Sequence, residues 1–171
     1  MGRCIGGRVA KSDCAIGLIQ IHSTRKDIEG NLREMVGRIE DLAANKAELM
    51  IAPEVALTGW QFDIEEWRGV AQTIPGSATE EIGAAAKKAN AYVAFGMVES
   101  NGDDIHNAVA VVGPNGSLVG KYRKTHLWSF ENDIFTRGDE MCLVDMEFGI
   151  VAITICYDAC FPEAGYFLRA T

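Results

Sequence analysis

The sequence lacks three features that define large classes of protein: a long apolar run, an excess of basic residues and a cysteine framework. No apolar run approaches the roughly 20 residues needed to span a bilayer, and the first 13 residues contain no apolar core of a secretory signal. Sixteen Lys and Arg stand against 24 Asp and Glu, for a net charge of −8. This balance disfavours nucleic acid and anionic membranes as partners, because both are bound by basic side chains. We therefore expect a cytoplasmic protein.

The five cysteines fit no metal or disulfide pattern. No CxxC pair occurs, and the count is odd. Cys156 and Cys160 are four residues apart and can share a helical face, but no His or Cys nearby completes a zinc site. We expect reduced thiols, no metal and no other cofactor.

The remaining composition is that of a folded domain. The 171 residues are 48% hydrophobic and 23% charged, which is ordinary for one globular domain with a core. We expect a disordered leader over 1–13 and a single domain over 14–171. No internal repeat or linker divides the chain.

Apolar runs and amphipathic segments alternate over the first hundred residues. Buried strands are predicted at three apolar runs of strand length, 14–21, 48–52 and 92–98. One helix is predicted after Asp27, where apolar residues recur every three or four positions. A second begins at Ser77, with Glu80 completing a capping box, and ends near Asn90. This alternation is typical of an α/β fold.

Two hairpins are predicted in the second half of the chain. One joins 105–112 to 117–122 through a Gly-Pro-Asn-Gly turn, and the other joins 141–146 to 149–155. A short helix is then expected from Pro162 to Thr171. The apolar strand 149–155 requires cover on both faces, so we expect the chain to lack a C-terminal part of its domain.

Three short segments place reactive side chains where strands end. Glu54 follows the strand 48–52, where a carboxylate can act as a general base. The basic segment 120–127 can supply a cation for an oxyanion. Cys156 lies between a buried strand and the start of a helix, where a thiolate is favoured and free N–H groups, that of Tyr157 first, can bind an oxyanion. Each segment alone also fits a plainer role: a solvated Glu, a basic surface cluster or an inert core cysteine.

The three segments together resemble the signatures of the nitrilase superfamily. The matching runs, in the family's order and approximate spacing, are PE at 53–54, YRK-x-HL at 122–127 and ICYD-x-x-FPE at 155–163. The resemblance implies a four-layer α-β-β-α sandwich, incomplete here at its C-terminal end. It further implies that Glu54 is the general base, Lys124 the cation beside the oxyanion and Cys156 the nucleophile. Glu131 matches a second glutamate that positions the lysine or the substrate.

The resemblance also narrows the reaction. Tyr157-Asp158 after the cysteine is similar to the amidase, ω-amidase and carbamoylase branches, which implies hydrolysis of a small-molecule amide or carbamoyl C–N bond through a thioester. Trp60 and Trp128 are expected to line the substrate pocket or, alternatively, to fill the core. A homo-oligomer is expected. Two alternatives stay open: a Cys–His enzyme using His22, His106 or His126, and a truncated, inactive fragment that serves at most as an interaction module.

Overall fold

The computed structural model describes residues 13–162 and 165. Its strands are β1 (Ile16–Leu18), β2 (Leu49–Ile51), β3 (Tyr92–Asn101), β4 (Asp104–Val112), β5 (Leu118–Arg123), β6 (Cys142–Met146) and β7 (Gly149–Ile153). Its helices are α1 (Ile28–Ala44), α2 (Ile64–Val70) and α3 (Ser77–Ala89), with the 3-10 helices η1 (Ser129–Asp133) and η2 (Cys156–Cys160). No helix in this part of the chain is long and apolar enough to cross a membrane.

The first five strands form one mixed sheet in chain order. β1, β2 and β3 are parallel, and β3, β4 and β5 are antiparallel. Tight turns join the antiparallel strands, with Gly102 and Gly116 at positive φ of 64° and 85°, which favours glycine. β6 and β7 form a separate hairpin. The two predicted hairpins are confirmed as β4–β5 and β6–β7, and β3 and β4 form a further antiparallel pair that was not predicted.

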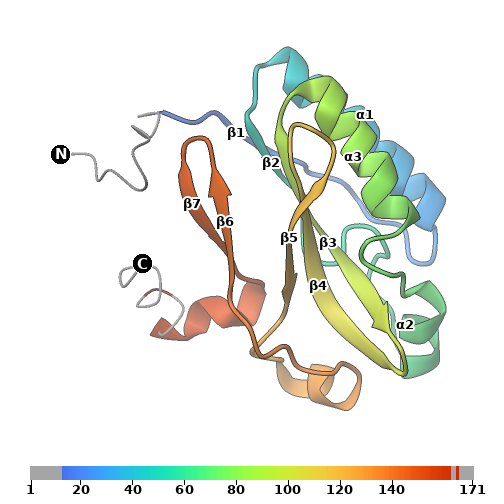
Figure 1. Cartoon of the computed structure of the whole chain (residues 1–171). Helices are drawn as coiled ribbons and strands as arrows, with labels where there is room; N and C mark the ends of the chain where they lie inside the picture. The colour runs from blue at the N-terminus through green and yellow to red at the C-terminus, as the bar shows by residue number, and fades with distance from the viewer. Residues whose placement is uncertain (1–12, 163–164, 166–171) are drawn as a thin grey trace.

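The elements stack in three layers (Figure 1). α1 and α3 cover one face of the five-stranded sheet, and the β6–β7 hairpin lies over the other face. The helix-side core includes Met35, Ile39, Ile82, Met50, Phe95 and Met97. The core between the sheets includes Leu49, Ala94, Val111, Tyr122, Val144, Met146 and Ile153. Each fully buried aliphatic side chain contributes about 1.5–3 kcal/mol, so both cores stabilise the stack.

The inner face of the large sheet is only partly covered in the described structure. Ile16 and Leu18 of β1 are 59% and 63% exposed. They pair in register with Leu49 and Ile51 and therefore share the face on which the β6–β7 hairpin packs. Apolar surface is therefore exposed at this edge of the sheet.

The predicted α/β class is confirmed, and the described residues supply the α-β-β part of the sandwich. The helix expected from Pro162 onward lies outside the described residues, apart from Pro162 and Gly165. The leader expected over 1–13 likewise lies outside them, apart from Asp13.

α3 begins at Ser77 and ends beside Asn90, as predicted, but the predicted capping box is wrong. Gly76, not Ser77, precedes the helix, and the Thr79 hydroxyl, not Glu80, accepts the Gly76 N–H at 2.8 Å. Thr79 is buried and Glu80 is exposed, so the shorter side chain is the one held against the backbone.

A buried carboxylate on β3 binds two basic side chains of the edge strand β5. Glu99 is 2% exposed and accepts hydrogen bonds from Lys121 Nζ and from Arg123 Nε, both at 2.7 Å. Burial alone would raise the pKa of Glu99, but the bonds from Arg123 and Lys121 outweigh it and lower that pKa.

We expect this ion cluster to make the fold acid-labile. A carboxyl with a lowered folded pKa stabilises the protein above its unfolded pKa of about 4.3, and that stabilisation is lost as the pH falls further. Thermal unfolding between pH 7 and pH 3 should show a falling midpoint. Glu99→Gln should lower the unfolding free energy at pH 7 by about 2 kcal/mol and make the acid slope shallower. Equal slopes for both proteins would show that Glu99 plays no part.

Candidate active site

The residues singled out from the sequence come from four separate segments that meet at one end of the sheets. Glu54 follows β2, and Lys124 directly follows β5. Glu131 lies in η1, and Cys156 is the first residue of η2, three residues after the end of β7. Strand ends thus supply three of the four side chains, as the sequence predicts.

Lys124 is the centre of the cluster. Its Nζ lies 2.8 Å from Glu54 Oε1 and 2.8 Å from Glu131 Oε2. Lys124 is only 2% exposed, and Glu131 is as deeply buried. Burial alone would lower the pKa of Lys124, but the hydrogen bonds from its ammonium to Glu131 and Glu54 outweigh it and raise that pKa. The side chain therefore stays a cation between two carboxyl groups.

Asn107 is a further member of the cluster, one to which no role is assigned from the sequence. Its Nδ2 donates to Glu54 Oε1 at 2.7 Å and to Glu131 Oε1 at 3.0 Å, and its carbonyl accepts the Lys124 N–H at 2.9 Å. The side chain therefore donates to the same two carboxylate oxygens that Lys124 Nζ contacts and helps to hold both carboxylates in place. A buried polar residue inside the apolar strand 105–112 was the available signal.

Glu131 is oriented by its own backbone as well. Its Oε2 accepts the Trp128 N–H at 2.6 Å, which closes a cap at the start of η1. Ser129, inside this turn, has a positive φ of 46°. A carboxylate that binds Lys124, Asn107 and the turn has little rotational freedom.

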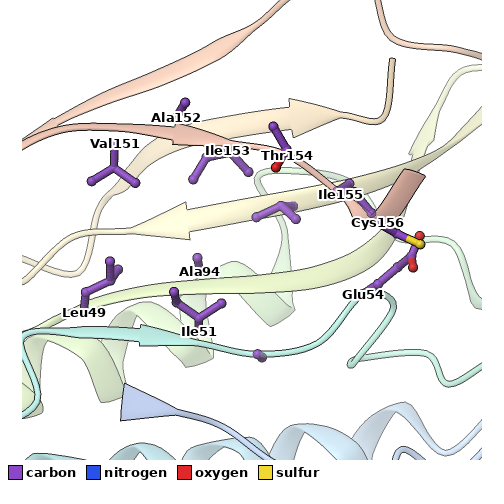
Figure 2. A pocket seen from close by; sticks show the side chains of 12 residues that line it. Leu49, Ile51, Glu54, Ala94, Val151, Ala152, Ile153, Thr154, Ile155 and Cys156 are labelled. Carbon is purple, nitrogen blue, oxygen red and sulfur yellow. The ribbon is translucent and has the colours of Figure 1, made fainter. Parts of the chain in front are cut away.

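Cys156 is held in an unusual backbone conformation beside Glu54. Its φ is +45°, which costs a non-glycine residue about 1–3 kcal/mol. Figure 2 shows its sulfur next to the Glu54 carboxylate at the mouth of a pocket. Strain of this kind persists where surrounding bonds fix the backbone, and it is common at reactive residues.

The expectation of a helix-stabilised thiolate is wrong. η2 is a five-residue 3-10 helix, too short for a strong dipole. Although Cys156 is exposed as a whole, its partial burial raises the pKa of the thiol first, the Glu54 carboxylate raises it further, and Lys124 opposes the shift. The resting group is a neutral thiol that needs a base, and Glu54 is the carboxylate in place to serve.

The pocket at this site has a volume of about 230 Å³ and runs between the two sheets. Its apolar wall comes from β2, β3, β4 and β7, and Glu54 and Cys156 lie at its polar end (Figure 2). No histidine among the described residues lines it. His106 Nδ1 is 2.7 Å from the Thr136 carbonyl, and His126 Nδ1 is 3.0 Å from Asp158 Oδ1. This geometry gives a Cys–His pair no support.

The Trp60 and Trp128 side chains, expected at the substrate pocket or in the core, lie outside the lining of this pocket. Trp60 and Trp128 both pack edge-on against Phe130, with ring centroids 6.0 and 5.7 Å away, and both remain partly exposed. The Tyr157 ring packs against Phe161. None of these side chains lines the pocket, and neither tryptophan fills the core, a role that falls to Trp67.

Gly96 of β3 allows the Glu54 turn to approach the sheet. A Cβ built on Gly96 would lie 2.4 Å from the Pro53 carbonyl oxygen and 2.8 Å from the Glu54 Cα. Val55, the next residue, has a positive φ of 48°, so the turn has little room to adjust. This glycine sets the position of Glu54, although no sequence pattern marks it.

We expect Gly96→Ala to destabilise the fold by about 1–3 kcal/mol through overpacking and to displace Glu54. Gly37→Ala is the matched control, because nothing lies within 4 Å of a Cβ there. In α1 that change should stabilise by about 0.5–1 kcal/mol. Urea unfolding of both variants measures the difference. Equal midpoints would show that the Glu54 turn does not require a glycine below it.

Metal ligands are not assembled here. Across residues 13–162 and 165, no group of three or more His, Cys, Asp or Glu side chains could hold a metal ion.

Known proteins are similar to this chain in sequence and in fold. A nitrilase of Pyrococcus abyssi is 33% identical over 152 residues, which cover 87% of this chain and 58% of that protein. The human omega-amidase NIT2 is 28% identical and is matched over 85% of this chain and 54% of its own length. The chain thus spans about half the length of the curated relatives it matches.

Solved structures agree with the topology. Saccharomyces cerevisiae Nit3, a member of branch 10 of the nitrilase superfamily, superposes with a TM-score of 0.81 at 23% identity, covering 90% of this chain and 59% of Nit3. XC1258 of Xanthomonas campestris, a CN-hydrolase superfamily protein, has a TM-score of 0.79 at 26% identity. The sequence profile of the carbon-nitrogen hydrolase family matches residues 15–171. The chain therefore belongs to the carbon-nitrogen hydrolase family, within the nitrilase superfamily.

Proposed function

We propose that this protein hydrolyses a non-peptide amide or carbamoyl C–N bond through a thioester on Cys156. The observation that carries the proposal is the bridge from Lys124 to Glu54 and Glu131 beside the Cys156 thiol. It combines a base, a fixed cation and a nucleophile at the polar end of one pocket. These are the three groups that acyl transfer requires.

The first half-reaction makes the thioester. Glu54 accepts the Cys156 thiol proton as the sulfur attacks the carbonyl carbon of the substrate. The carbonyl oxygen gains negative charge, which the Lys124 ammonium and the backbone N–H of Tyr157 stabilise. Glu54 then donates its proton to the leaving nitrogen. The C–N bond breaks, the amine departs, and the acyl group stays on sulfur.

The second half-reaction releases the acid. Glu54, ionised again, accepts a proton from a water molecule, whose oxygen attacks the thioester carbon. The same two donors stabilise the second oxyanion, and the Cys156 thiolate leaves and regains its proton from Glu54. Glu131 takes no part in the proton transfers and keeps Lys124 in place. The sum is amide plus water giving acid plus amine, without any cofactor.

The substrate class rests on sequence and relatives. Tyr157-Asp158 after the nucleophile resembles the amidase, ω-amidase and carbamoylase branches, and the human relative carries the name omega-amidase. We therefore place the substrates among small amides and N-carbamoyl compounds, and we propose that the active form is a homo-oligomer.

Release of ammonia or amine from a panel of such substrates tests the proposal. Cys156→Ala should abolish release, whereas Cys160→Ala, in the same short helix, should leave most of it. Both cysteines are exposed, so the pair controls for a general effect of losing a thiol. Undiminished release by Cys156→Ala would refute the nucleophile assignment.

The exposed inner face supports a second candidate, an inactive fragment of the fold. Ile16 and Leu18 are more than half exposed where a sandwich would bury them. A folded chain that releases no amine from any substrate would favour this alternative.

A further inference from the structure

Asp158 is a buried carboxylate with an unusually large number of donors. It is 1% exposed. Its Oδ1 accepts from His126 N at 2.9 Å and Thr125 Oγ1 at 3.1 Å, and it lies 3.0 Å from His126 Nδ1. Its Oδ2 accepts from the Tyr122 hydroxyl at 2.8 Å and from Ile155 N at 2.9 Å. The catalytic steps above use none of these atoms.

The donors come from the two segments that carry the reactive residues. Tyr122 lies two positions before Lys124, and Thr125 and His126 follow that lysine directly. Ile155 immediately precedes Cys156, and Asp158 itself lies two positions after it. One carboxylate therefore joins the lysine segment to the cysteine turn, across 32 to 36 residues of sequence.

The same carboxylate holds the strained turn. Asp158 Oδ2 accepts the Ile155 N–H, and the Asp158 N–H donates to the Ile155 carbonyl at 3.0 Å. This reciprocal pair encloses Cys156 at its φ of +45°. A single backbone residue in that region persists only where its neighbours fix it, and Asp158 provides both bonds.

The hydrogen bonds around Asp158 favour its ionised form. Burial alone would raise the pKa of Asp158, but bonds from Ile155, Tyr122 and His126 outweigh it and lower that pKa. Burial, with the nearby Asp158 charge, raises the pKa of Tyr122 to about 12, so its hydroxyl stays a donor. The carboxylate is thus ionised and fully bonded over the range in which an amidase works.

We infer that Asp158 is a positioning residue that holds the Cys156 sulfur against the Glu54–Lys124 pair by tying the cysteine turn to the lysine segment. The effect of Asp158 on catalysis rests on the proposed function. The contacts themselves are independent of any substrate. Asp158 thus has a positioning role in the site, in addition to its place in the Tyr157-Asp158 pair that resembles the amidase branches.

The direct readout is the rate of Cys156 alkylation by iodoacetamide between pH 6 and 10, measured by peptide mass spectrometry. In the unaltered chain the burial of Cys156 and the charges of Glu54, Lys124 and Glu131 set this profile. Asp158→Asn should free the thiol from Glu54 and move the half-maximal pH down by about one unit. Cys160 in the same sample is the internal reference.

Two further variants separate positioning from stability. Tyr122→Phe keeps the buried ring and removes one donor to Asp158, so it should shift the profile in the same direction but less. Its effect should be much smaller in an Asp158→Asn background, because both substitutions act on the same hydrogen bond, that between Tyr122 and residue 158. Glu99→Gln also weakens a buried carboxylate cluster, one that links β3 to β5, and should lower stability without moving the profile.

Several results would contradict the positioning role of Asp158 or the proposed function, and they can be told apart. If Glu99→Gln shifts Cys156 labelling as much as Asp158→Asn, or if Tyr122→Phe leaves labelling unchanged, Asp158 is only a structural residue. If Asp158→Asn does not fold, the Tyr122→Phe result decides. A chain that releases no amine but shows the expected labelling shifts would refute the proposed function and leave the positioning role standing.

Discussion

Replacing Lys124 by methionine should lower the unfolding free energy by about 3–5 kcal/mol, the cost of breaking a buried ion pair. The ammonium lies 2.8 Å from carboxylate oxygens of both Glu54 and Glu131. Without it, Asn107 is the remaining donor that the two carboxylates share. Two like charges so close together cannot both stay ionised without cost. Urea unfolding at pH 7 measures the loss.

Lys88→Met is the matched control for this prediction. Lys88 Nζ lies 2.7 Å from Glu40 Oε1, as close as in the buried pair, but both side chains are more than half exposed. A surface pair of this kind contributes about 0–1 kcal/mol. If Lys124→Met unfolds at the same urea concentration as Lys88→Met, the buried cluster does not stabilise the fold as we describe.

Replacing Glu54 by glutamine should slow acylation of Cys156 by about 10²–10⁴-fold, the usual contribution of a general base. Glutamine keeps the shape of the Glu54 side chain and can still accept the hydrogen bond from Asn107, but it cannot accept a proton. The same change removes a negative charge that raises the Cys156 pKa, so alkylation by iodoacetamide should begin at lower pH. A more reactive thiol in a less active protein is an opposed pair of effects that general destabilisation does not produce.

Glu80→Gln, on the exposed side of α3, controls for loss of an acidic side chain. It should change neither acylation nor the pH profile of alkylation. If Glu54→Gln lowers acylation without shifting the alkylation profile, the carboxylate does not act on the thiol.

The long, strongly patterned elements could be predicted from the sequence. The stripe after Asp27 becomes α1, and Asp27 caps it by accepting the Gly30 N–H at 2.9 Å. α2 was missed because its buried residues are only Trp67 and Val70, too few for a periodic signal. η1 was missed because a single 3-10 turn has no apolar period at all.

The candidate site could be predicted in part. Glu54, Lys124, Glu131 and Cys156 were singled out, and the structure brings them together, while their roles remain the proposal above. Asn107, Gly96 and Asp158 received no role, because their significance lies in contacts across the fold. Asn107 meets Glu54 from 53 residues away. A single sequence does not show which distant residues come into contact in the fold.

The thiolate expectation failed for a related reason. A strand followed by a helix start suggested a dipole that lowers the pKa of a cysteine. The pKa of Cys156 depends instead on burial and on a carboxylate from a segment about a hundred residues earlier, and both raise it. The sign of such a shift follows from the groups that meet at the site, which the local pattern does not specify.

Mass spectrometry of the intact chain after brief incubation with simple amides and N-carbamoyl amino acids is the most direct test of the central claim. We predict an acyl adduct on Cys156, located by peptide mapping, that is absent in Cys156→Ala and strongly reduced in Glu54→Gln. An adduct on Cys160 or Cys142 instead, or none from a chain that remains folded, would contradict the assignment of Cys156 as the nucleophile of a working site.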